Sequence, residues 1–253
     1  MTMYVLGDPH GHYDAVAGLL RGAGLVNHRL RWTGGDAVLW VAGDFFDRGP
    51  FGIDCLDLII RLQREAESVG GLVDSVIGNH DILLLAAQRF GGLFTGLWRR
   101  NGGRLPDLDR LTEQHRQWLI TRPAMVRVGD AIILHGDTTL YEDYGDTLEA
   151  VNRAFADLLA GDDMGAWYDL LDAFSEHQAF YDNPEAAARF RQRYGGDVLI
   201  HGHTPIMKIT RQIPREVTEA LVYDDGRCIN VDGGIYRGGP GFVYHTTPPA
   251  HPQ

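Results

Sequence analysis

Short apolar segments alternate with amphipathic ones through the first third of the chain. The apolar segments have the composition of buried strands, and the amphipathic ones space their apolar residues along one face of a helix. Strands that alternate with helices predict a parallel sheet covered by helices, which limits this part of the chain to an α/β arrangement. In chain order the expected elements are a strand at 3–6, a helix at 13–24, a strand at 37–42, a helix at 52–68, a strand at 72–77 and a helix at 81–90.

Hairpins are expected in the second half of the chain. Residues 124–137 and 220–234 each contain two apolar runs separated by a turn of Gly and Asp, which predicts two β-hairpins. Residues 147–193 have the pattern of helices, and residues 197–205 that of a further strand and its loop. The expected fold class is therefore α/β of the α+β kind, with a mixed sheet that begins with parallel units and ends with hairpins.

Neither a repeat nor a linker divides the sequence, so we expect one domain over residues 1–246. Within it, residues 141–195 are expected to form a helical insert over the functional site, acidic along much of its length. Residues 247–253 are polar and rich in proline, and we expect this tail to be disordered. The aromatic residues of the insert, which we expect to form a local core, are Trp167, Tyr168, Phe174, Phe180 and Tyr181.

Composition argues against several classes of protein. The net charge of −11 argues against a broad surface for nucleic acid, and no apolar run approaches the roughly 18 residues that span a bilayer. Two cysteines, Cys55 and Cys228, are too few for a disulfide framework and are expected to pack as small core residues. Strand-like sequence begins at Met3, which leaves no room for a signal peptide. We therefore expect a cytoplasmic protein with neither a membrane nor a nucleic-acid polymer as partner.

Polar clusters follow five of the expected strands. They read GDPHGH, GDFFDRG, GNHD, HGD and HGHTP, and they begin at Gly7, Gly43, Gly78, His135 and His201. Ligands of open α/β sheets bind at the carboxyl ends of strands, so these side chains are expected to converge. Any one cluster is more often a turn or a supporting group, whereas the whole series indicates one functional site.

The residue types in these clusters indicate metal chemistry. Carboxylate, amide and imidazole ligands without a thiolate suit Mn²⁺, Fe or Zn²⁺. Two such cations need a shared anionic ligand, and together they stabilise the attacking and leaving oxygens of an in-line displacement. Arg48 follows the carboxylates of the second cluster and offers a planar fork suited to phosphate oxygens.

Taken in this order, the clusters resemble the signatures of the calcineurin-like metallophosphoesterases. The DRG ending of the second cluster, which begins at Asp47, is similar to the phosphoprotein-phosphatase branch of that superfamily. The stretch from Met3 to about Leu85, with RWTGGD before the second strand, resembles the bacterial Shewanella-like phosphatases. The resemblance implies a calcineurin-like fold, which is a central β-sandwich of mixed sheets flanked by helices.

The resemblance also implies two metal sites that share the carboxylate of Asp44. Asp8 and His10 match ligands of the first metal. Pro205 stands where the wider superfamily often has a further histidine, which leaves the first metal three protein ligands. Two ligand carboxylates and two dications give the site a net charge of about +2, which attracts a phosphate dianion. The implied ligands of the second metal are Asn79, His135 and His203.

Three further residues match catalytic positions of the family. His80 resembles the general acid that protonates the leaving oxygen, Asp47 the residue that orients it, and Arg48 the phosphate clamp. The implied enzyme is a dinuclear metal-dependent phosphomonoesterase, a protein phosphatase of the Ser/Thr type, in which metal-bound hydroxide attacks phosphorus in line. Two divalent ions are the implied cofactors, with Mn²⁺ first and Fe or Zn²⁺ as alternatives. The implied substrate is a phosphorylated protein, a phosphopeptide or a small phosphoester.

Two other interpretations stay open. A dinucleoside-polyphosphate hydrolase, which acts on diadenosine tetraphosphate, shares these motifs. A non-enzymatic scaffold is the second, although the intact His80, Asp47 and Arg48 argue against it. The sequence distinguishes neither Ser/Thr from Tyr substrates nor one oligomeric state from another.

Several residues depart from the pattern of the family or are left without a clear role. Asp81 stands where protein phosphatases often have Glu, so any salt bridge from this position differs. Asp137 stands where they commonly have Gly, and it is either a turn residue or a contact of the metal shell. His201 is not expected to bind metal, and His12 is expected near the mouth of the site. A second phosphate-binding arginine is expected from the insert, and the candidates are Arg153, Arg189, Arg191 and Arg193.

Overall fold

Four strands form the first sheet, in the order β3-β2-β1-β9. The computed structural model describes residues 2–246. It places β1 (Met3–Leu6), β2 (Val38–Val41) and β3 (Leu72–Ser75) parallel to one another, whereas β9 (Val243–His245) is antiparallel to β1. The parallel unit predicted for the start of the chain is thereby confirmed, and the expected tail at 247–253 lies outside the described residues.

Five strands form the second sheet, in the order β4-β5-β6-β8-β7. Its central strands are parallel, and each expected hairpin supplies an antiparallel pair, β4 with β5 and β7 with β8. Both hairpins are confirmed, although they extend a second sheet and do not continue the first. The strands are β4 (Met125–Val128), β5 (Ala131–Leu134), β6 (Val198–His201), β7 (Leu221–Tyr223) and β8 (Cys228–Asn230).

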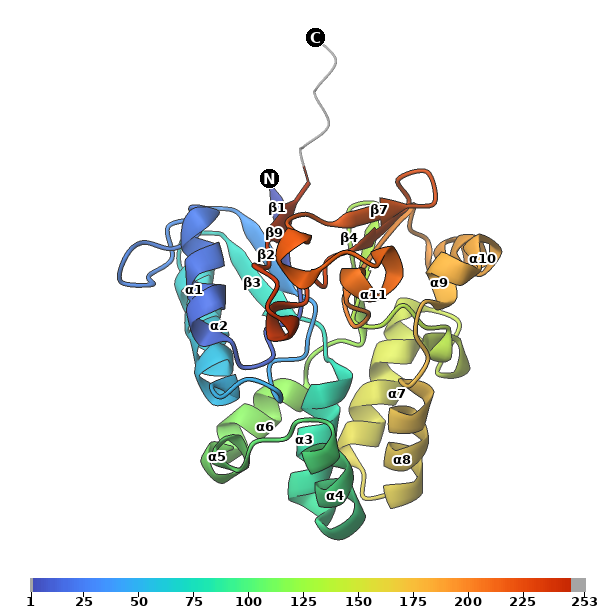
Figure 1. The fold of residues 1–253 in the computed structure, drawn as a ribbon. Helices are drawn as coiled ribbons and strands as arrows, with labels where there is room; N and C mark the ends of the chain where they lie inside the picture. Colours follow the sequence, from blue (N-terminus) through green and yellow to red (C-terminus); the bar gives the residue numbers. More distant parts are fainter. Residues whose placement is uncertain (1, 247–253) are drawn as a thin grey trace.

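The two sheets pack face to face, as a β-sandwich (Figure 1). Side chains alternate along each strand, so Val5 faces the opposite sheet whereas Leu6 faces the covering helices. The layer between the sheets contains Met3, Val5, Val38, Trp40, Ala42, Val76, Ala131, Ile133, Ile200, Ile229 and Val231. The predicted β-sandwich of mixed sheets flanked by helices is therefore confirmed.

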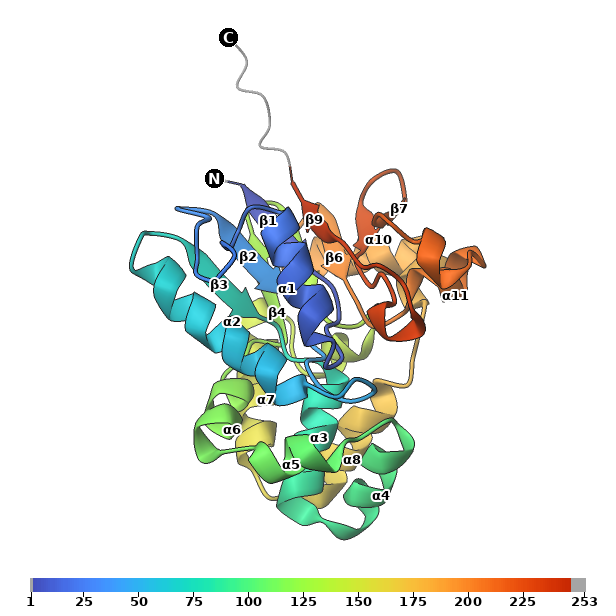
Figure 2. The same cartoon turned by 60° about the vertical axis from the view of Figure 1, so that its left-hand side comes forward.

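Helices cover the outer face of the first sheet. Figure 2 shows α1 (Tyr13–Gly22) and α2 (Gly52–Glu67) lying across β1, β2 and β3. Leu20 and Leu56 are fully buried there, together with Cys55, which confirms the expected core position of that cysteine. Among residues 2–246, no helix combines the length and apolar character needed to cross a membrane.

A group of helices extends from the strand ends, below the sheets in Figure 1. The pattern of residues 91–123 predicted no element, yet this segment contains three helices that follow α3. The helix α3 packs closely on α4 and also touches α8, so the segment and the insert build this region together. The helices are α3 (Asn79–Phe90), α4 (Gly92–Arg100), α5 (Leu105–Arg110) and α6 (Glu113–Ile120).

The expected helical insert contributes to the main hydrophobic core. Trp167, Phe174 and Phe180 are buried in that core, whereas Tyr168 and Tyr181 are exposed, so the predicted separate local core is wrong. The helix α7 packs against β4 and α8 packs against α3, so apolar residues of the insert join the main hydrophobic core. The elements of the insert are η1 (Leu140–Asp143), α7 (Leu148–Ala160), α8 (Met164–Ala173), α9 (Ala179–Asp182) and α10 (Pro184–Tyr194).

Short helical segments complete the rim of the strand ends. They follow β6 and β8 and are α11 (Ile206–Thr210), η2 (Pro214–Glu216) and η3 (Ile235–Arg237). The backbone amide of Ile206 donates to the carbonyl of Asp232, which ties α11 to the loop after β8. This tie brings two segments without a recognisable sequence signature beside the five predicted clusters.

Candidate metal centre and phosphate pocket

The loops after the strands hold several site residues in an unusual backbone conformation. The φ angles of His10, Asp44, Asp47, Arg48 and His203 lie between 42° and 70°. Non-glycine residues rarely adopt this region, and each instance costs on the order of 1–3 kcal/mol. Contacts with the rest of the fold hold these loops in this conformation, for example the hydrogen bond from the Arg48 amide to the Gly102 carbonyl (2.8 Å). The strain therefore coincides with the residues that the sequence predicts to be functional.

Two motif glycines make room for carboxylates. A Cβ atom at Gly78 would lie 2.2 Å from Asp44 Oδ1, and one at Gly202 would lie 2.0 Å from Asp8 Oδ1. Both distances are far below van der Waals contact, so any larger residue would displace a carboxylate. The Gly of GNHD and the Gly of GHTP are therefore required by the position of Asp44 and Asp8.

Asp81 braces the second cluster from beneath. Its carboxylate accepts hydrogen bonds from the backbone amides of Asp44 (2.9 Å), Phe45 (2.8 Å) and Gly78 (3.0 Å). Among residues 2–246 it forms no salt bridge. The shorter Asp in place of Glu thus binds the backbone that carries Asp44.

Three acceptor atoms converge at the position predicted for the second metal. Asn79 Oδ1 lies 2.9 Å from His135 Nε2 and 3.1 Å from His203 Nδ1, and the two imidazole nitrogens are 3.2 Å apart. His135 Nδ1 donates to the Ala42 carbonyl (2.7 Å), and His203 Nε2 faces the Glu176 carbonyl (3.2 Å). Because each ring uses its other nitrogen as a donor, the converging nitrogens are acceptors, as in metal-binding histidines.

The carboxylate of Asp44 lies between two imidazoles. One of its oxygens is 3.5 Å from His10 Nε2, and the other is 3.5 Å from His135 Nε2. His10 Nδ1 donates to the Phe46 carbonyl (2.9 Å), which again leaves Nε2 as an acceptor. This is the geometry expected of a carboxylate shared between two cations.

Asp8 completes the first position. Its Oδ2 accepts from the backbone amide of His203 (3.0 Å), which joins the first cluster to the last. Its Oδ1 is buried and has no hydrogen-bond partner among residues 2–246. A buried carboxylate oxygen is costly unless something pairs with it, and a divalent cation fits that requirement.

The pKa values of these groups suit cation binding. Burial lowers the pKa of His10, His135 and His203, which keeps the rings neutral and their lone pairs free. Burial alone would raise the pKa of Asp44, but the neighbouring imidazoles, whenever one is protonated, and the Arg48 guanidinium outweigh burial and lower that pKa, so Asp44 is ionised. Neutral imidazoles around an ionised carboxylate are a donor set for divalent metals.

The predicted ligands group around Asp44 in a slightly different way from the prediction. Asp44 belongs to one group of potential ligands with Asp8 and His135, and to another with His10 and His80. The ligand atoms of each group lie within 4.8 Å of one another. Asp8 thus lies closer to the second position, and His80 closer to the first, than the assignment by resemblance implies.

His80 is held by a carboxylate and a tryptophan. His80 Nδ1 donates to Asp47 Oδ2 (2.6 Å), and Asp47 Oδ1 accepts from the indole of Trp98 (2.6 Å). Burial raises the pKa of Asp47, and these two hydrogen bonds oppose that rise. Trp98 lies on α4, in the segment for which the sequence predicted nothing, and a single tryptophan gives no signal of this role.

Arg48 extends its fork over the cluster. Its Nη1 lies 2.7 Å from His10 Nε2, and its Nη2 lies 2.8 Å from His80 Nε2. The guanidinium packs 4.0 Å from the centre of the Tyr236 ring. Tyr236 comes from η3, and sequence reasoning missed it.

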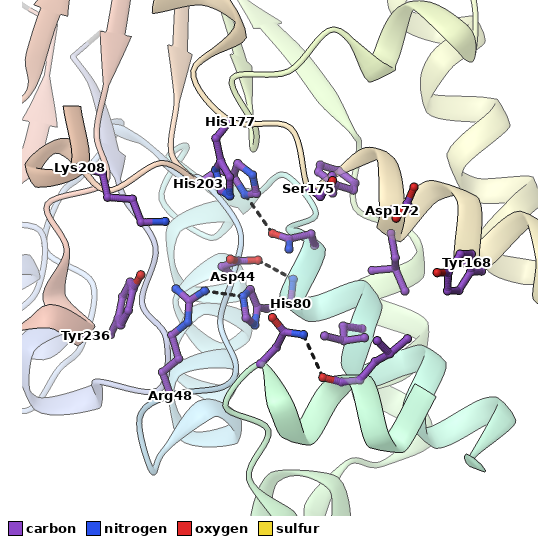
Figure 3. Close-up of a pocket in the computed structure, with 16 residues that line it drawn as sticks. Asp44, Arg48, His80, Tyr168, Asp172, Ser175, His177, His203, Lys208 and Tyr236 are labelled. Carbon is purple, nitrogen blue, oxygen red and sulfur yellow. Dashed lines mark hydrogen bonds between the residues drawn. The ribbon is translucent and has the colours of Figure 1, made fainter. Parts of the chain in front are cut away.

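Asp44, Asn79, His80 and His203 form one end of a cavity of about 290 Å³, shown in Figure 3. Asp8, His10 and His135 contact these residues without lining the cavity themselves. Helices and short segments supply its sides. We define the floor as Asp8, His10, Asp44, Asn79, His80, His135 and His203. The basic wall consists of Arg48, Lys208 and Tyr236, and the apolar wall of Leu83, Leu97, Tyr168, Leu171 and Phe174.

Asp137 connects the insert to the last cluster. Its carboxylate accepts from the hydroxyl of Thr204 (2.6 Å) and from the amide of Gln178 (2.9 Å), and burial raises its pKa to about 7. It also lies in one group of potential ligands with His177 and His203. His177, which the sequence analysis missed, stacks on the ring of His203 at 4.2 Å. Asp137 is thus buried and hydrogen-bonded to Thr204 and Gln178, and is not an exposed turn residue.

The two remaining histidines of the motifs lie away from the acceptors. His201 is buried, and its Nε2 lies 2.8 Å from the hydroxyl of Tyr223 on the neighbouring hairpin. His12 is half-buried at the start of α1, where its side chain forms no hydrogen bond among the described residues. Neither belongs to a group of potential metal ligands in residues 2–246.

The lining of the cavity corrects the expectation that the insert supplies a second phosphate-binding arginine. None of the four candidates, Arg153, Arg189, Arg191 and Arg193, lines the cavity. Arg191 is buried against Asp224 (2.7 Å) and Cys228, and Arg193 pairs with Asp146. The helix α10 packs on β6, and these contacts engage Arg191 and Arg193 outside the cavity. Cys228 is buried beneath Arg191, as predicted for a core residue.

Comparison with known proteins places this geometry in a family. The model of the calcineurin-like phosphoesterase family matches residues 1–207. A symmetrical bis(5'-nucleosyl)-tetraphosphatase of Shigella dysenteriae is 36% identical over 132 residues, which cover 49% of this chain and 38% of that protein. An Escherichia coli protein of the same name is 35% identical over 132 residues, 49% of this chain and 39% of its own. The matched segment thus spans less than half of these relatives.

Solved structures share the fold. A cold-active protein-tyrosine phosphatase of a psychrophilic Shewanella species superposes with a TM-score of 0.76 at 20% identity, covering 96% of this chain and 74% of that chain. A protein serine/threonine phosphatase of Saccharomyces cerevisiae superposes with a TM-score of 0.61 at 19% identity, covering 98% of this chain and 73% of that chain. At these identities the likeness concerns the fold alone.

Proposed function

Because the chain belongs to the calcineurin-like phosphoesterase family, we propose that this phosphoester hydrolase is a dinuclear metal-dependent phosphomonoesterase that acts on phosphorylated proteins or peptides. The observation that carries the proposal is the convergence of Asn79 Oδ1, His135 Nε2 and His203 Nδ1 within 3.2 Å of one another beside Asp44. The His80–Asp47 pair adjoins this cluster and supplies the acid that hydrolysis requires.

The floor would hold two divalent cations, with Asp44 between them. His10 lies beside one oxygen of Asp44 and His135 beside the other. Asp8 is assigned with His10 to the first cation by the resemblance, and Asn79 and His203 with His135 to the second. When bound, the cations lower the pKa of water and neutralise charge on the phosphate oxygens. Mn²⁺ is the first expectation, with Fe and Zn²⁺ as alternatives, because all three accept mixed oxygen and imidazole ligands.

Proton transfer falls to His80. Asp47 holds the Nδ1 proton, so Nε2, which faces Arg48 here, is the atom that would take up a second proton once Arg48 engages the phosphate and pass it to the leaving oxygen. The carboxylate of Asp47 stabilises the imidazolium before transfer, and Trp98 fixes that carboxylate. Arg48 lies at hydrogen-bonding distance from His80 Nε2, which places its fork where phosphate oxygens would bind.

The apolar wall supports a substrate whose phosphate is attached to an organic side chain. Leu83 and Phe174 form its buried part, and Tyr168 is 44% exposed at its outer end. Such a surface contacts the group that carries the phosphate while the floor engages the phosphate itself. A preference for phosphoserine and phosphothreonine over phosphotyrosine is our prediction within this class.

A dinucleoside polyphosphate is the second candidate substrate. The named function of the relatives from Shigella dysenteriae and Escherichia coli favours it, because their similarity covers 49% of this chain. The floor would serve either substrate. The choice therefore depends on the walls and is decided by assay.

A substrate panel tests the proposal. Purified protein with added Mn²⁺ is assayed against phosphoserine, phosphothreonine and phosphotyrosine peptides and against diadenosine tetraphosphate. We expect phosphopeptide hydrolysis with a kcat/KM at least about tenfold above that for the dinucleotide, a difference worth about 1.4 kcal/mol. Hydrolysis of the dinucleotide alone would replace the proposal by the second candidate. Absence of turnover with every phosphoester would favour a non-enzymatic scaffold.

A further inference from the structure

The chain contains a single lysine, Lys208, against 22 arginines. This residue lies on α11, five positions after His203, and it lines the cavity. In Figure 3 its side chain extends from the side of Tyr236 toward Arg48 and Asp44, with the nitrogen end leading. The one lysine of the protein therefore points at the floor from the basic wall.

The surroundings of α11 fix this position. Ile206 is 2% exposed, and its backbone amide donates to the Asp232 carbonyl (3.0 Å). A Cβ atom at Gly234 would lie only 2.3 Å from the terminal methyl of Met207, so α11 packs tightly on the loop after β8. Lys208 thus extends from an anchored turn, although its own side chain is exposed.

The charge of Lys208 has no direct partner in the described part of the chain. No hydrogen bond or ion pair of its ammonium is found among residues 2–246, although the protein carries 34 acidic residues. Burial of the stem lowers the pKa of Lys208, and Arg237 and Arg48 lower it further by repulsion. Cations that repel one another around a cavity are stabilised when an anion binds between them.

We propose that Lys208 is the second cationic side chain that binds the phosphate of the substrate, together with Arg48 of the same basic wall. The inference deepens the proposed phosphoester hydrolysis and rests on it. It also accounts for the correction above, since the four candidate arginines of the insert do not line the cavity and Lys208 does. An ammonium group makes point contacts without the fixed fork of an arginine, so Lys208 contributes charge more than orientation.

The single lysine permits a direct binding test. Reductive methylation with ¹³C-formaldehyde labels only Lys208 and the N-terminal amine and keeps the positive charge. We expect the Lys208 methyl resonance of the Zn²⁺-loaded protein to shift as inorganic phosphate is added, while the N-terminal resonance stays in place. A Lys208 resonance that does not move at phosphate concentrations that inhibit hydrolysis would overturn the inference.

Substitution gives a second, independent readout. In Lys208→Met we expect the inhibition constant of inorganic phosphate to rise about tenfold, the lower end for a charge-assisted hydrogen bond, with Lys208→Arg restoring most of it. Arg215→Met is the matched control, because Arg215 is an exposed cation of η2 outside the cavity. An unchanged constant in Lys208→Met would overturn the inference and leave the proposed function intact.

The two proposals fail separately. If phosphate shifts the Lys208 resonance but the loaded protein hydrolyses no phosphoester, the binding role of Lys208 stands and the proposed function is wrong. If phosphopeptides are hydrolysed with the same KM and phosphate inhibition in wild type and Lys208→Met, the proposed function stands and the role of Lys208 is wrong.

Discussion

The floor and the walls of the cavity are built by different means. Floor residues lie in the loops after strands or, for Asn79 and His80, in the first turn of α3; they are buried, apart from the half-buried Asn79, and several have a left-handed backbone. Apart from Arg48, which lies in the loop after β2, wall residues lie on helices and short segments and include the exposed Tyr168 and Lys208. The carboxyl ends of the strands hold side chains rigidly enough for metal ligands. The helices packed around them shape the surface that contacts the substrate.

The largest expected effect is at the centre of the floor. Asp44→Asn removes the charge that two cations would share, so we expect metal content to fall below one ion per chain and kcat/KM to fall by at least about 10³-fold. Asp54→Asn is the control, because Asp54 pairs with Arg110 near the surface. Full metal content in Asp44→Asn would contradict the bridging position.

Removal of the proposed acid separates chemistry from metal binding. His80→Ala is expected to lower kcat by about 10²–10⁴-fold while both cations stay bound, because His80 is not among the assigned ligands. The matched control is His115→Ala, since His115 also pairs with an aspartate, Asp57, at 3.0 Å but far from the floor. Metal analysis of the purified variants decides the point, and loss of a cation from His80→Ala would make His80 a ligand.

A carboxylate buried elsewhere contrasts with Asp44, whose pKa is lowered. Asp107 is 1% exposed, and burial raises its pKa to about 6. A raised pKa means that the folded protein favours the protonated form, so the stability contributed by that proton is complete below about pH 4 and is lost as the pH rises through 6.

Asp107→Asn stays neutral at every pH and keeps an oxygen that can accept from the Ile53 amide, as Asp107 does now. We therefore expect it to be more stable than wild type by about 2–3 kcal/mol at pH 8, with the gain disappearing toward pH 4. Urea unfolding at both pH values measures this difference. Equal stability of the two proteins at pH 8 would show that Asp107 stays ionised without cost.

The tryptophan behind Asp47 has an intermediate effect. Trp98→Phe removes the hydrogen bond to Asp47 Oδ1, so we expect kcat to fall about tenfold with KM little changed. Trp118→Phe is the matched control, because Trp118 donates a comparable hydrogen bond to Gln63 (2.9 Å) outside the cavity. An equal loss of activity in both variants would indicate general destabilisation and no specific support of His80.

The smallest expected effect is on the apolar wall. Tyr168→Ala is expected to raise KM for a phosphopeptide about threefold and leave kcat and metal content unchanged, because Tyr168 contacts only the group that carries the phosphate. Tyr181→Ala is the control, since Tyr181 is similarly exposed (41%) but does not line the cavity. A large fall in kcat for Tyr168→Ala would blur the distinction between floor and wall.

The same division explains what could be predicted from the sequence. Glycine-bounded clusters after apolar strands announce Asp8, Asp44 and His203, because the strand end itself fixes where these side chains lie. No such sequence pattern surrounds Trp98 and Tyr236, because they reach the site only through the packing of α4 and η3. The insert was expected to supply the second phosphate-binding arginine. The positions of the arginines on α10 depend on how α10 packs on β6, which the local sequence pattern does not specify.

The central claim is that the floor holds two cations that share Asp44. Anomalous diffraction from crystals grown with Mn²⁺ tests it most directly. We predict two peaks about 3.5–4 Å apart, one on each side of the Asp44 carboxylate, with Asp8 and His10 at one and Asn79, His135 and His203 at the other. A single peak, or two peaks that do not both contact Asp44, would contradict the account.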